Sequence, residues 1–556
     1  MEGIRRCKSL VPLLILIVLY SAIAFVNLGN TQSPQSTWSS IEAVTIDFGE
    51  VRYISRFQFM VGARHDIDFM LFTSEDAYNW AYELHVHSME VFRWEERHIG
   101  YYARYIQIIP FSYGLRLQEI AFRDEHDNLI RNLRIIASEP EAFALIDEQH
   151  LVPSGYGFMN STYFDEIYHA RTAYEFIHGL PVFETTHPPM GKNFISLGIR
   201  AFGMTPFGWR FAGTITGILM IPLMYLFGRI MFQSNFWGFM AAFIFAFDFM
   251  TFAQTRIATI DSYVVFFIMA SYLFMYIYYR YAKHMTLTPS LICLLGSAIC
   301  IAFAIATKWQ GLYAAIGLPI MFFPAWLNVY KISKKNAWLT FTACFPIFIA
   351  IPILIYALSY IPFVNAMDTG DGFIQTVLYN QVHMFTYHSD LIADHPFGSR
   401  WWEWPLIIRP IFYYVNHLPN GMHQGISSFG NPAVWWTGIA ATFTVAIAWV
   451  RKKLNKRDYQ IVSFLLIAYA MQILPWIFVY RLTFIYHYFP SVPFVILIIV
   501  FCLKNYVWTK YPKIVLIYGS VVYGLFMLFY PVLSGLPVSV EFANTFLRWL
   551  PAWVLI

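Results

Sequence analysis

An acidic pair and a short basic segment lie close together in the first third of the chain. Asp165 and Glu166 precede a helical pattern, and His187 is followed by two prolines and by Lys192. A carboxylate in such a place can act as a general base that takes the proton of an attacking hydroxyl. An acidic pair is also typical of a helix N-terminus, where the helix dipole favours negative charge, and two prolines are typical of a rigid turn. The residues alone leave these alternatives open.

Further ionisable residues stand at the ends of apolar runs later in the chain. Such groups are costly at membrane depth and are usually functional. Each also has a simpler explanation, because long cations can snorkel to the surface and Arg256 could pair with Asp261. Together they predict one cavity with carboxylates on one side and cations on the other, which suits a phosphate carried on a lipid. These residues are Arg210, Arg256, Asp261, Lys308 and Arg481.

The composition predicts a membrane protein with many spans. Of 556 residues, 58% are hydrophobic and only 13% are charged, against roughly a quarter charged in soluble domains. The net charge is +4 and there are five cysteines, none of which lies in the polar stretch 29–188. We therefore expect no disulfide framework there.

Eleven apolar runs are long enough to cross a membrane, at about 20 residues each. The basic clusters RYAKH, KISKK, RKKLNKR and KNYVWTKYPK share one side only if the short run 190–203, which holds Lys192 and Arg200, does not cross. The positive-inside rule then places the N-terminus in the cytoplasm and the C-terminus outside. We expect 190–203 to be an amphipathic helix at the outer surface. The eleven runs are 10–28, 208–231, 236–255, 262–280, 290–307, 311–329, 337–361, 432–450, 459–479, 485–503 and 514–535.

Residues 36–137 have a different pattern, in which polar and apolar residues alternate in short runs. AVTIDFG, ISRFQFMVG, IDFMLFTS and LRLQEIAFRD are examples, and they predict the strands of a β-sandwich. The order of these runs resembles a discoidin-like (F5/8 type C) domain. The matching pieces are 47–49, 74–80, 103–105 and 117–120. The resemblance implies a carbohydrate or lipid ligand, and the alternative is a spacer or packing domain.

The motifs outside this domain resemble the protein O-mannosyltransferases, which are GT-C-fold enzymes that use a polyprenyl-phosphate sugar. FDE, HPPMGK, TRIATIDS and TKWQGLY carry the resemblance, and HSDLIADHPFGSRWWEWPLIIRPIFYY, GNPAVWW and RLTFIYHYFPSVPF are similar to the bacterial branch. The resemblance runs from about 160 to 535. It implies a GT-C membrane fold with about 11 transmembrane helices and the extracytoplasmic β-sandwich as an insertion.

The resemblance assigns roles to particular residues. It implies that Asp165 is the catalytic base, with Glu166 as its neighbour and main competitor. The expected donor-binding residues are His187, Lys192, Arg210, Arg256, Asp261, Lys308, Arg481, Tyr486 and His487, and the expected acceptor-side loop residues are His395, Trp404 and Arg409. The implied reaction inverts the anomeric centre in one displacement while cations stabilise the leaving phosphate.

Two departures from the family bear on the acceptor. Residues 362–431 are too short for the soluble repeats of eukaryotic members, and the discoidin-like insertion is not part of the usual bacterial pattern. The expected acceptors are Ser and Thr hydroxyls of exported proteins, with mannose as the expected sugar. The rival function is sugar transfer to a lipid or a cell-wall polymer. A transporter would need inverted repeats and broken helices, and neither is visible in the sequence; a simple anchor would not need eleven spans.

The expected partners are the polyprenyl-phosphate sugar, a secreted protein or polymer acceptor, membrane lipid and a carbohydrate ligand of the discoidin-like domain. We expect no nucleic-acid partner, no established cofactor and no metal, since the His and Asp residues of 383–395 are loosely spaced. The expected location is the cell membrane, with the catalytic site outside the cytoplasm. The predicted parts are a first helix (1–30), the sandwich (36–137), the first outer loop with the catalytic motif (138–207), helices 2–7 (208–361), the second outer loop (362–431) and helices 8–11 with the C-terminus (432–556).

Overall fold

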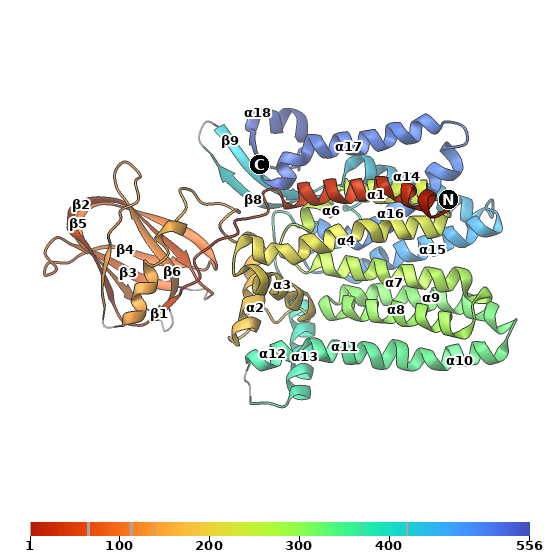
Figure 1. Ribbon diagram of the computed structural model, residues 1–556, viewed down its shortest axis with the longest axis horizontal. Helices are drawn as coiled ribbons and strands as arrows, with labels where there is room; N and C mark the ends of the chain where they lie inside the picture. Colours follow the sequence, from red (N-terminus) through yellow and green to blue (C-terminus); the bar gives the residue numbers. More distant parts are fainter. Residues whose placement is uncertain (1, 64–66, 112–114, 138, 368–369, 419–420) are drawn as a thin grey trace. The chain divides into compact units, whose positions relative to one another are not determined.

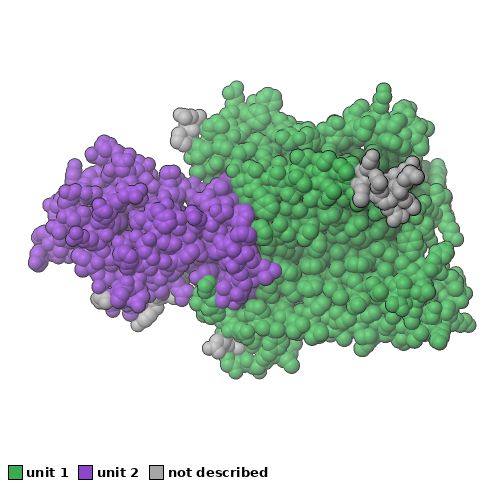
Figure 2. All heavy atoms as spheres, viewed as in Figure 1, with its two compact units in different colours: residues 1–28, 178–195, 210–556 green, residues 29–177, 196–209 purple. Residues whose placement is uncertain are grey.

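The computed structural model describes residues 2–63, 67–111, 115–137, 139–367, 370–418 and 421–556. The chain forms two compact units, which are coloured separately in Figure 2 and are described here one at a time. Unit 1 is helical and comprises residues 1–28, 178–195 and 210–556. Unit 2 contains the β-sheet and comprises residues 29–177 and 196–209.

Most of unit 1 consists of long apolar helices that run side by side (Figure 1). Within the described chain, nine helical segments are long and apolar enough to cross a membrane. Each coincides with a predicted span, so the multi-span class is confirmed. The nine segments are Pro206–Phe232, Asp261–His284, Leu287–Thr307, Gln310–Tyr330, Lys334–Met367, Pro432–Val450, Lys456–Phe478, Ile485–Val507 and Pro512–Ser534.

The other two predicted spans coincide with shorter apolar helices, Leu10–Phe25 and Asn235–Ala246. The count of eleven therefore remains a prediction. The run 190–203 is helical, as α3 (Met190–Phe202), and is absent from both sets of candidate spans. This agrees with the expectation that it does not cross.

The remaining helices of the bundle have the following bounds. They are α1 (Glu2–Phe25), α4 (Pro206–Phe232), α5 (Asn235–Ala246), α6 (Phe249–Gln254), α7 (Asp261–Tyr281), α8 (Leu287–Thr307), α9 (Gln310–Tyr330), α10 (Lys334–Phe345), α11 (Ile351–Ser359), α14 (Pro432–Val450), α15 (Lys456–Ile473), α16 (Val492–Cys502) and α17 (Pro512–Ser534). Helix α16 is the innermost, since nearly every residue along it is buried.

The predicted continuous run 236–255 is wrong in one respect, because the helix breaks between α5 and α6. Asp248 stands at the break, and its carboxylate accepts hydrogen bonds from the Thr251 N–H (3.2 Å) and the Trp435 indole (3.0 Å). An aspartate that caps the second helix while binding a distant tryptophan stabilises the break. Hydrophobic pattern alone could not reveal it, since the run stays apolar on both sides.

Short elements of the second predicted loop lie at one end of the bundle (Figure 1). They are α12 (Ile361–Met367), α13 (Phe373–Asp390) and the hairpin of β8 (Ile411–His417) and β9 (Met422–Ser428), to which β10 (Pro537–Ser539) adds a third strand. The C-terminal segment meets the same loop, where the Trp553 indole donates to the Ile407 carbonyl at 2.8 Å. The second loop and the C-terminus therefore share one end of the bundle.

Unit 2 contains a seven-stranded antiparallel sheet in the order β1-β6-β2-β5-β3-β4, with β7 paired to β2. Apolar side chains alternate along the strands and form one core, so the predicted strands are confirmed. The strands are β1 (Trp38–Ser40), β2 (Val44–Val61), β3 (Ile67–Ser74), β4 (Ala81–Ser88), β5 (Arg93–Pro110), β6 (Leu115–Arg123) and β7 (Arg134–Ile136).

The core of this sheet extends beyond the predicted boundary at residue 137. Ala142, Leu145 and Ile146 belong to it, and the Arg123 guanidinium donates to the Pro153 carbonyl at 2.8 Å. At the other end, the Gln118 amide donates to the Pro34 carbonyl at 3.1 Å. These contacts tie residues 34–153 into one folded part.

Candidate functional site

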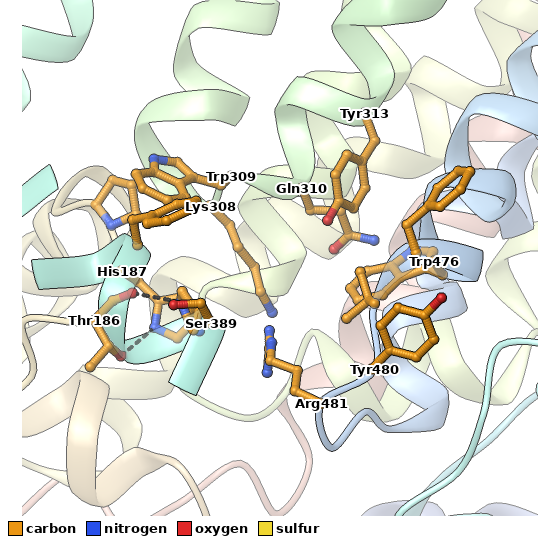
Figure 3. A pocket seen from close by; sticks show the side chains of 15 residues that line it. Thr186, His187, Lys308, Trp309, Gln310, Tyr313, Ser389, Trp476, Tyr480 and Arg481 are labelled. Atoms are coloured by element: carbon orange, nitrogen blue, oxygen red, sulfur yellow. Dashed lines mark hydrogen bonds between the residues drawn. The ribbon is translucent and has the colours of Figure 1, made fainter. Parts of the chain in front are cut away.

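A cavity of about 340 Å³ opens at the end of unit 1 that carries the second loop (Figure 3). Its walls come from four separate segments of the chain: the turn before α3, the start of α9, the end of α13 and the segment that follows α15. Residues lining it are Thr186, His187, Pro188, Lys308, Trp309, Gln310, Tyr313, Phe385, His388, Ser389, Trp476, Phe478, Val479, Tyr480 and Arg481. Of the predicted donor-binding residues, the cavity gathers His187, Lys308 and Arg481.

Two cations converge in the middle of this cavity. Figure 3 shows the side chains of Lys308 and Arg481 extending towards each other from opposite walls. The Lys308 ammonium pairs with Asp261 at 2.8 Å and lies over the Tyr486 ring, 5.4 Å from its centroid. Asp261 therefore pairs with Lys308, and the alternative pairing with Arg256 is wrong.

Arg481 has a different environment from Lys308. Its guanidinium donates to the neighbouring Leu482 carbonyl at 3.3 Å, and among the described residues no carboxylate pairs with it. Burial lowers the pKa of Arg481, with only tyrosines acting in the opposite direction. Lys308, Arg481 and Asp261 together carry one net positive charge, so the cavity attracts an anion.

The turn before α3 is organised by Glu184, a residue that the sequence reasoning missed. Its buried carboxylate forms an ion pair with Lys192 and accepts hydrogen bonds from the Thr186 N–H (2.9 Å) and from His187 Nδ1 (3.0 Å). A carboxylate only accepts, so Nδ1 of His187 carries the proton. Lys192 also donates to the His187 carbonyl at 2.9 Å and is fully buried. Lys192 thus holds the turn in place behind the cavity.

His187 and His388 form the third side of the cavity. Their rings lie 5.2 Å apart in an edge-to-face arrangement. Burial lowers the pKa of His187 against the opposing effect of Glu184, and burial lowers the pKa of His388 to about 3. Both rings are therefore neutral near pH 7. His388 is the first residue of the motif HSDLIADHPFGSR that carries the family resemblance, but the sequence assigned no role to it.

Arg210 and Arg256 do not line this cavity. Instead they donate to backbone carbonyls at the end of α1: Arg210 to Leu28 (2.8 Å), and Arg256 to Ile23 (2.9 Å), Val26 (2.8 Å) and Asn27 (2.9 Å). The last carbonyls of a helix have no partners within it, and cations are favourable there. The expected role of both residues in donor binding stays a prediction, and these hydrogen bonds hold the end of α1.

Tyr486 and His487 lie behind the cavity, in the first turn of the innermost span. Tyr486 packs beneath Lys308 as described above. The His487 ring lies 4.5 Å from the Trp476 ring and 4.6 Å from the Tyr486 ring, and its carbonyl accepts from the Gln310 amide at 2.9 Å. Both therefore support the wall of the cavity.

A second, larger cavity of about 610 Å³ shares one wall with the first. The shared wall is Trp476, Val479, Tyr480 and Arg481. The three predicted acceptor-side residues, His395, Trp404 and Arg409, all line the second cavity. Arg409 donates to the carbonyls of Pro396 (3.2 Å) and Gly398 (3.1 Å), which fixes the fold of this loop.

Asp165 and Glu166 belong to unit 2, where they begin α2 (Glu166–His178). Glu166 is fully buried, and its carboxylate accepts from the Tyr163 N–H at 3.2 Å. Asp165 is partly exposed and follows Phe164, whose φ of 48° lies in the left-handed region. Backbone strain of this kind clusters at functional sites. The two carboxylates thus differ locally, although they are adjacent in sequence.

The fold first shows the structural class to which the chain belongs. A solved structure of the Saccharomyces cerevisiae protein O-mannosyltransferase Pmt1–Pmt2 complex bound to the sugar donor matches with a TM-score of 0.64 at 14% identity, over 71% of this chain and 89% of that chain. The chain therefore has the fold of a GT-C membrane glycosyltransferase.

Sequence comparison identifies the family within this class. A model described as dolichyl-phosphate-mannose-protein mannosyltransferase matches residues 201–366, and one described as the C-terminal four-helix membrane region of protein O-mannosyltransferase matches residues 373–553. The two successive matches span well over half of the chain, which belongs to the protein O-mannosyltransferase family.

Curated bacterial relatives agree with this. The polyprenol-phosphate-mannose–protein mannosyltransferase of Mycobacterium tuberculosis is 24% identical over 70% of this chain and 86% of its own length. The protein of the same name from Mycolicibacterium smegmatis is 25% identical over 70% of this chain and 87% of its own length.

Proposed function

We propose that the chain transfers mannose from a polyprenyl phosphate to Ser and Thr hydroxyls of exported proteins, with inversion at the anomeric carbon. The observation that carries the proposal is the convergence of Lys308 and Arg481 in a cavity with one net positive charge. The mycobacterial relatives are named for transfer of mannose from polyprenol phosphate to protein, and this chain covers most of their length.

The charge of the cavity favours the transition state over the bound donor. A sugar linked to polyprenyl phosphate is a phosphodiester with one negative charge, and the departing polyprenyl phosphate carries more negative charge. In the step, the acceptor oxygen forms a bond to the sugar C1, the bond from C1 to the phosphate oxygen breaks, and the electron pair leaves with the phosphate. Lys308 and Arg481 would bind that growing charge most strongly as it develops, which accelerates the reaction.

A general base must take the proton of the acceptor hydroxyl, and we assign this role to Asp165. Its side chain is partly exposed beside a strained residue, whereas Glu166 is buried and accepts from the Tyr163 N–H. Neighbouring residues on a helix point about 100° apart, so one of the pair is expected to face the sugar.

The test is turnover of purified protein with polyprenyl-phosphate mannose and a Ser/Thr-rich secreted peptide. Asp165→Asn keeps the shape and removes the base, so we expect turnover to fall on the order of 100- to 10,000-fold with donor affinity retained. Glu166→Gln is the matched control at the adjacent position. Near-normal turnover of Asp165→Asn would refute this mechanism, and loss of turnover in Glu166→Gln alone would move the base by one residue. Wild-type protein that mannosylates a lipid or polymer but no peptide would refute the proposed acceptor.

We also propose that the second loop, the C-terminus and the cavity face the outside, with the N-terminus in the cytoplasm. The distribution of basic residues supports this orientation, and so does the contact between Trp553 and Ile407, which puts the C-terminus with the second loop.

The sheet of unit 2 is, on this proposal, a discoidin-like β-sandwich that binds carbohydrate. In the sheet, β1 lies beside β6 and not beside β2. A jelly roll also has connections that place strands distant in sequence side by side. Exposed aromatic rings are the groups that sugars stack against, and Tyr78, Tyr101 and Tyr102 are largely exposed. Binding of mannose-containing glycans to this part, lost in Tyr102→Ala, would support the assignment.

A further inference from the structure

Three polar atoms in the walls of the first cavity are buried without a hydrogen-bond partner in the described protein. They are Oε1 of Gln310, Nε1 of Trp476 and Nδ1 of His388, and all three residues line the cavity. Buried polar groups are nearly always hydrogen-bonded, and each exception calls for a physical explanation. Gln310 and Trp476 are each only 4% exposed.

For Gln310 and His388, the hydrogen bond of one side-chain atom shows whether the other atom donates or accepts. The Gln310 amide nitrogen donates to the His487 carbonyl at 2.9 Å, so the other atom of the amide is its oxygen, an acceptor. His388 Nε2 lies 2.9 Å from the Thr186 carbonyl, which can only accept, so Nε2 carries the proton and Nδ1 is an acceptor. The indole nitrogen of Trp476 can only donate.

The three side chains come from separate elements that the protein holds firmly. Gln310 begins α9 and His388 lies in the last turn of α13. The Trp476 ring is packed edge-to-face against Trp404, with 5.4 Å between ring centroids. In Figure 3 the Gln310 amide lies on the α9 side of the cavity.

Two acceptors and one donor do not suit a phosphate, because phosphodiester oxygens only accept hydrogen bonds. They suit hydroxyl groups, each of which can donate one hydrogen bond and accept another. We propose that Gln310, Trp476 and His388 bind the hydroxyls of the transferred sugar, next to the phosphate held by Lys308 and Arg481. This inference rests on the proposed function and adds to it the residues that select the sugar.

The experiment compares two ligands on the full-length protein in nanodiscs. One is polyprenyl-phosphate mannose, and the other is polyprenyl phosphate without a sugar. Three substitutions each remove one of the three polar atoms while keeping a side chain of similar size: Gln310→Met, Trp476→Phe and His388→Gln. The last keeps a nitrogen at the position from which Nε2 donates to Thr186. We expect each variant to weaken binding of the mannose-bearing ligand about 3- to 10-fold, the effect of one neutral hydrogen bond, with binding of the sugar-free ligand unchanged.

Two controls separate recognition of the sugar from support of the fold. His388→Asn returns an acceptor near the Nδ1 position, so it should restore part of the affinity for the mannose-bearing ligand. Trp38→Phe removes another buried indole N–H without a partner, on β1 of the sheet, and should leave both ligands unaffected.

The outcomes distinguish the inference from the function on which it rests. Equal loss for both ligands, or no change for either, would overturn the assignment of the sugar-binding atoms. Failure of the wild-type protein to bind either ligand would instead refute the proposed function. A reduced thermal unfolding temperature with unchanged ligand selectivity would assign the three side chains to stability alone and would also overturn the inference.

Discussion

At the scale of single residues, the chemistry of the cavity depends on a cation without a carboxylate partner. The charge of Lys308 is compensated by Asp261, while Arg481 is half-buried and pairs with no carboxylate among the described residues. A buried, unpaired charge is costly, and burial lowers the pKa of Arg481. A phosphate bound beside Arg481 would compensate this charge and remove its energetic cost.

We therefore predict that Arg481→Gln weakens binding of polyprenyl phosphate about 10- to 100-fold, the range for a hydrogen bond to a charged group. The same change should raise the thermal unfolding temperature of the ligand-free protein, since it removes an uncompensated charge. Titration of the lipid into nanodiscs and a thermal unfolding scan measure the two effects. Arg451→Gln, at an exposed turn after α14, is the matched control, and an equal loss of affinity there would show a general effect of surface charge.

At the scale of elements, two arginines hold the end of the first helix. Arg210 and Arg256 together reach four carbonyls between Ile23 and Leu28. These contacts join α1 to segments nearly two hundred residues or more away in sequence. The first helix is thus fixed by hydrogen bonds as well as by packing in the bundle.

Removing the hydrogen bonds from these arginines to the end of α1 should destabilise unit 1. We expect Arg256→Met to lower the free energy of unfolding by about 1.5–3 kcal/mol, because three carbonyls lose a charged donor. Denaturation in mild detergent with increasing SDS measures the change. Arg200→Met, an exposed arginine on α3, should have little effect; a similar loss in both variants would contradict the clamp.

The sheet of unit 2 contains a buried carboxyl group with an unusual pH response. Glu119 on β6 is fully buried and accepts from the Glu148 N–H at 3.0 Å and from the Gln149 amide. Burial raises the pKa of Glu119 to about 8. The folded state therefore keeps a proton that the unfolded state loses above its ordinary pKa near 4.5, so this residue makes stability fall as pH rises from about 4.5 to 8.

Residues 33–153 provide the material for this measurement, because they contain the described strands β1 to β7 and the core residues of the sheet. We expect this fragment to be soluble and rich in β-structure by circular dichroism. Glu119→Gln should flatten the decline of the unfolding midpoint between pH 5 and 8. An identical pH dependence in both proteins would mean that Glu119 is ionised in the folded state, and a disordered fragment would refute an independent domain.

At the scale of the whole molecule, the proposed orientation can be tested with single cysteines. In a protein without its five native cysteines, Ile392→Cys and Tyr78→Cys should react with an impermeant thiol reagent added outside intact cells. Lys453→Cys should react only after the cells are opened. Ile392 is 98% exposed and Tyr78 is 88% exposed, so access does not limit the reaction. Reaction of the Ile392 and Lys453 variants from the same side would show that a span has been miscounted.

The sequence by itself determined the elements and their class. Long apolar runs predict spans because a membrane-crossing helix must hide its backbone and present apolar side chains, and alternation predicts strands because successive side chains point to opposite faces. It also marked His187, Lys308 and Arg481, since ionisable groups at the ends of apolar runs are rare enough to be informative.

The tertiary structure decided which of these groups share a cavity. Arg256 and Lys308 look alike in sequence, as cations at the ends of apolar runs, but one binds carbonyls of α1 and the other lines the cavity. Gln310 lies within the motif TKWQGLY but was given no role from the sequence. Glu184 and Trp476 carry no local signal, because a buried acid or indole becomes functional only through the groups that folding brings beside it. Sequence spacing fixes the position of a residue along one element, whereas hydrogen-bond partners are supplied by segments hundreds of residues away.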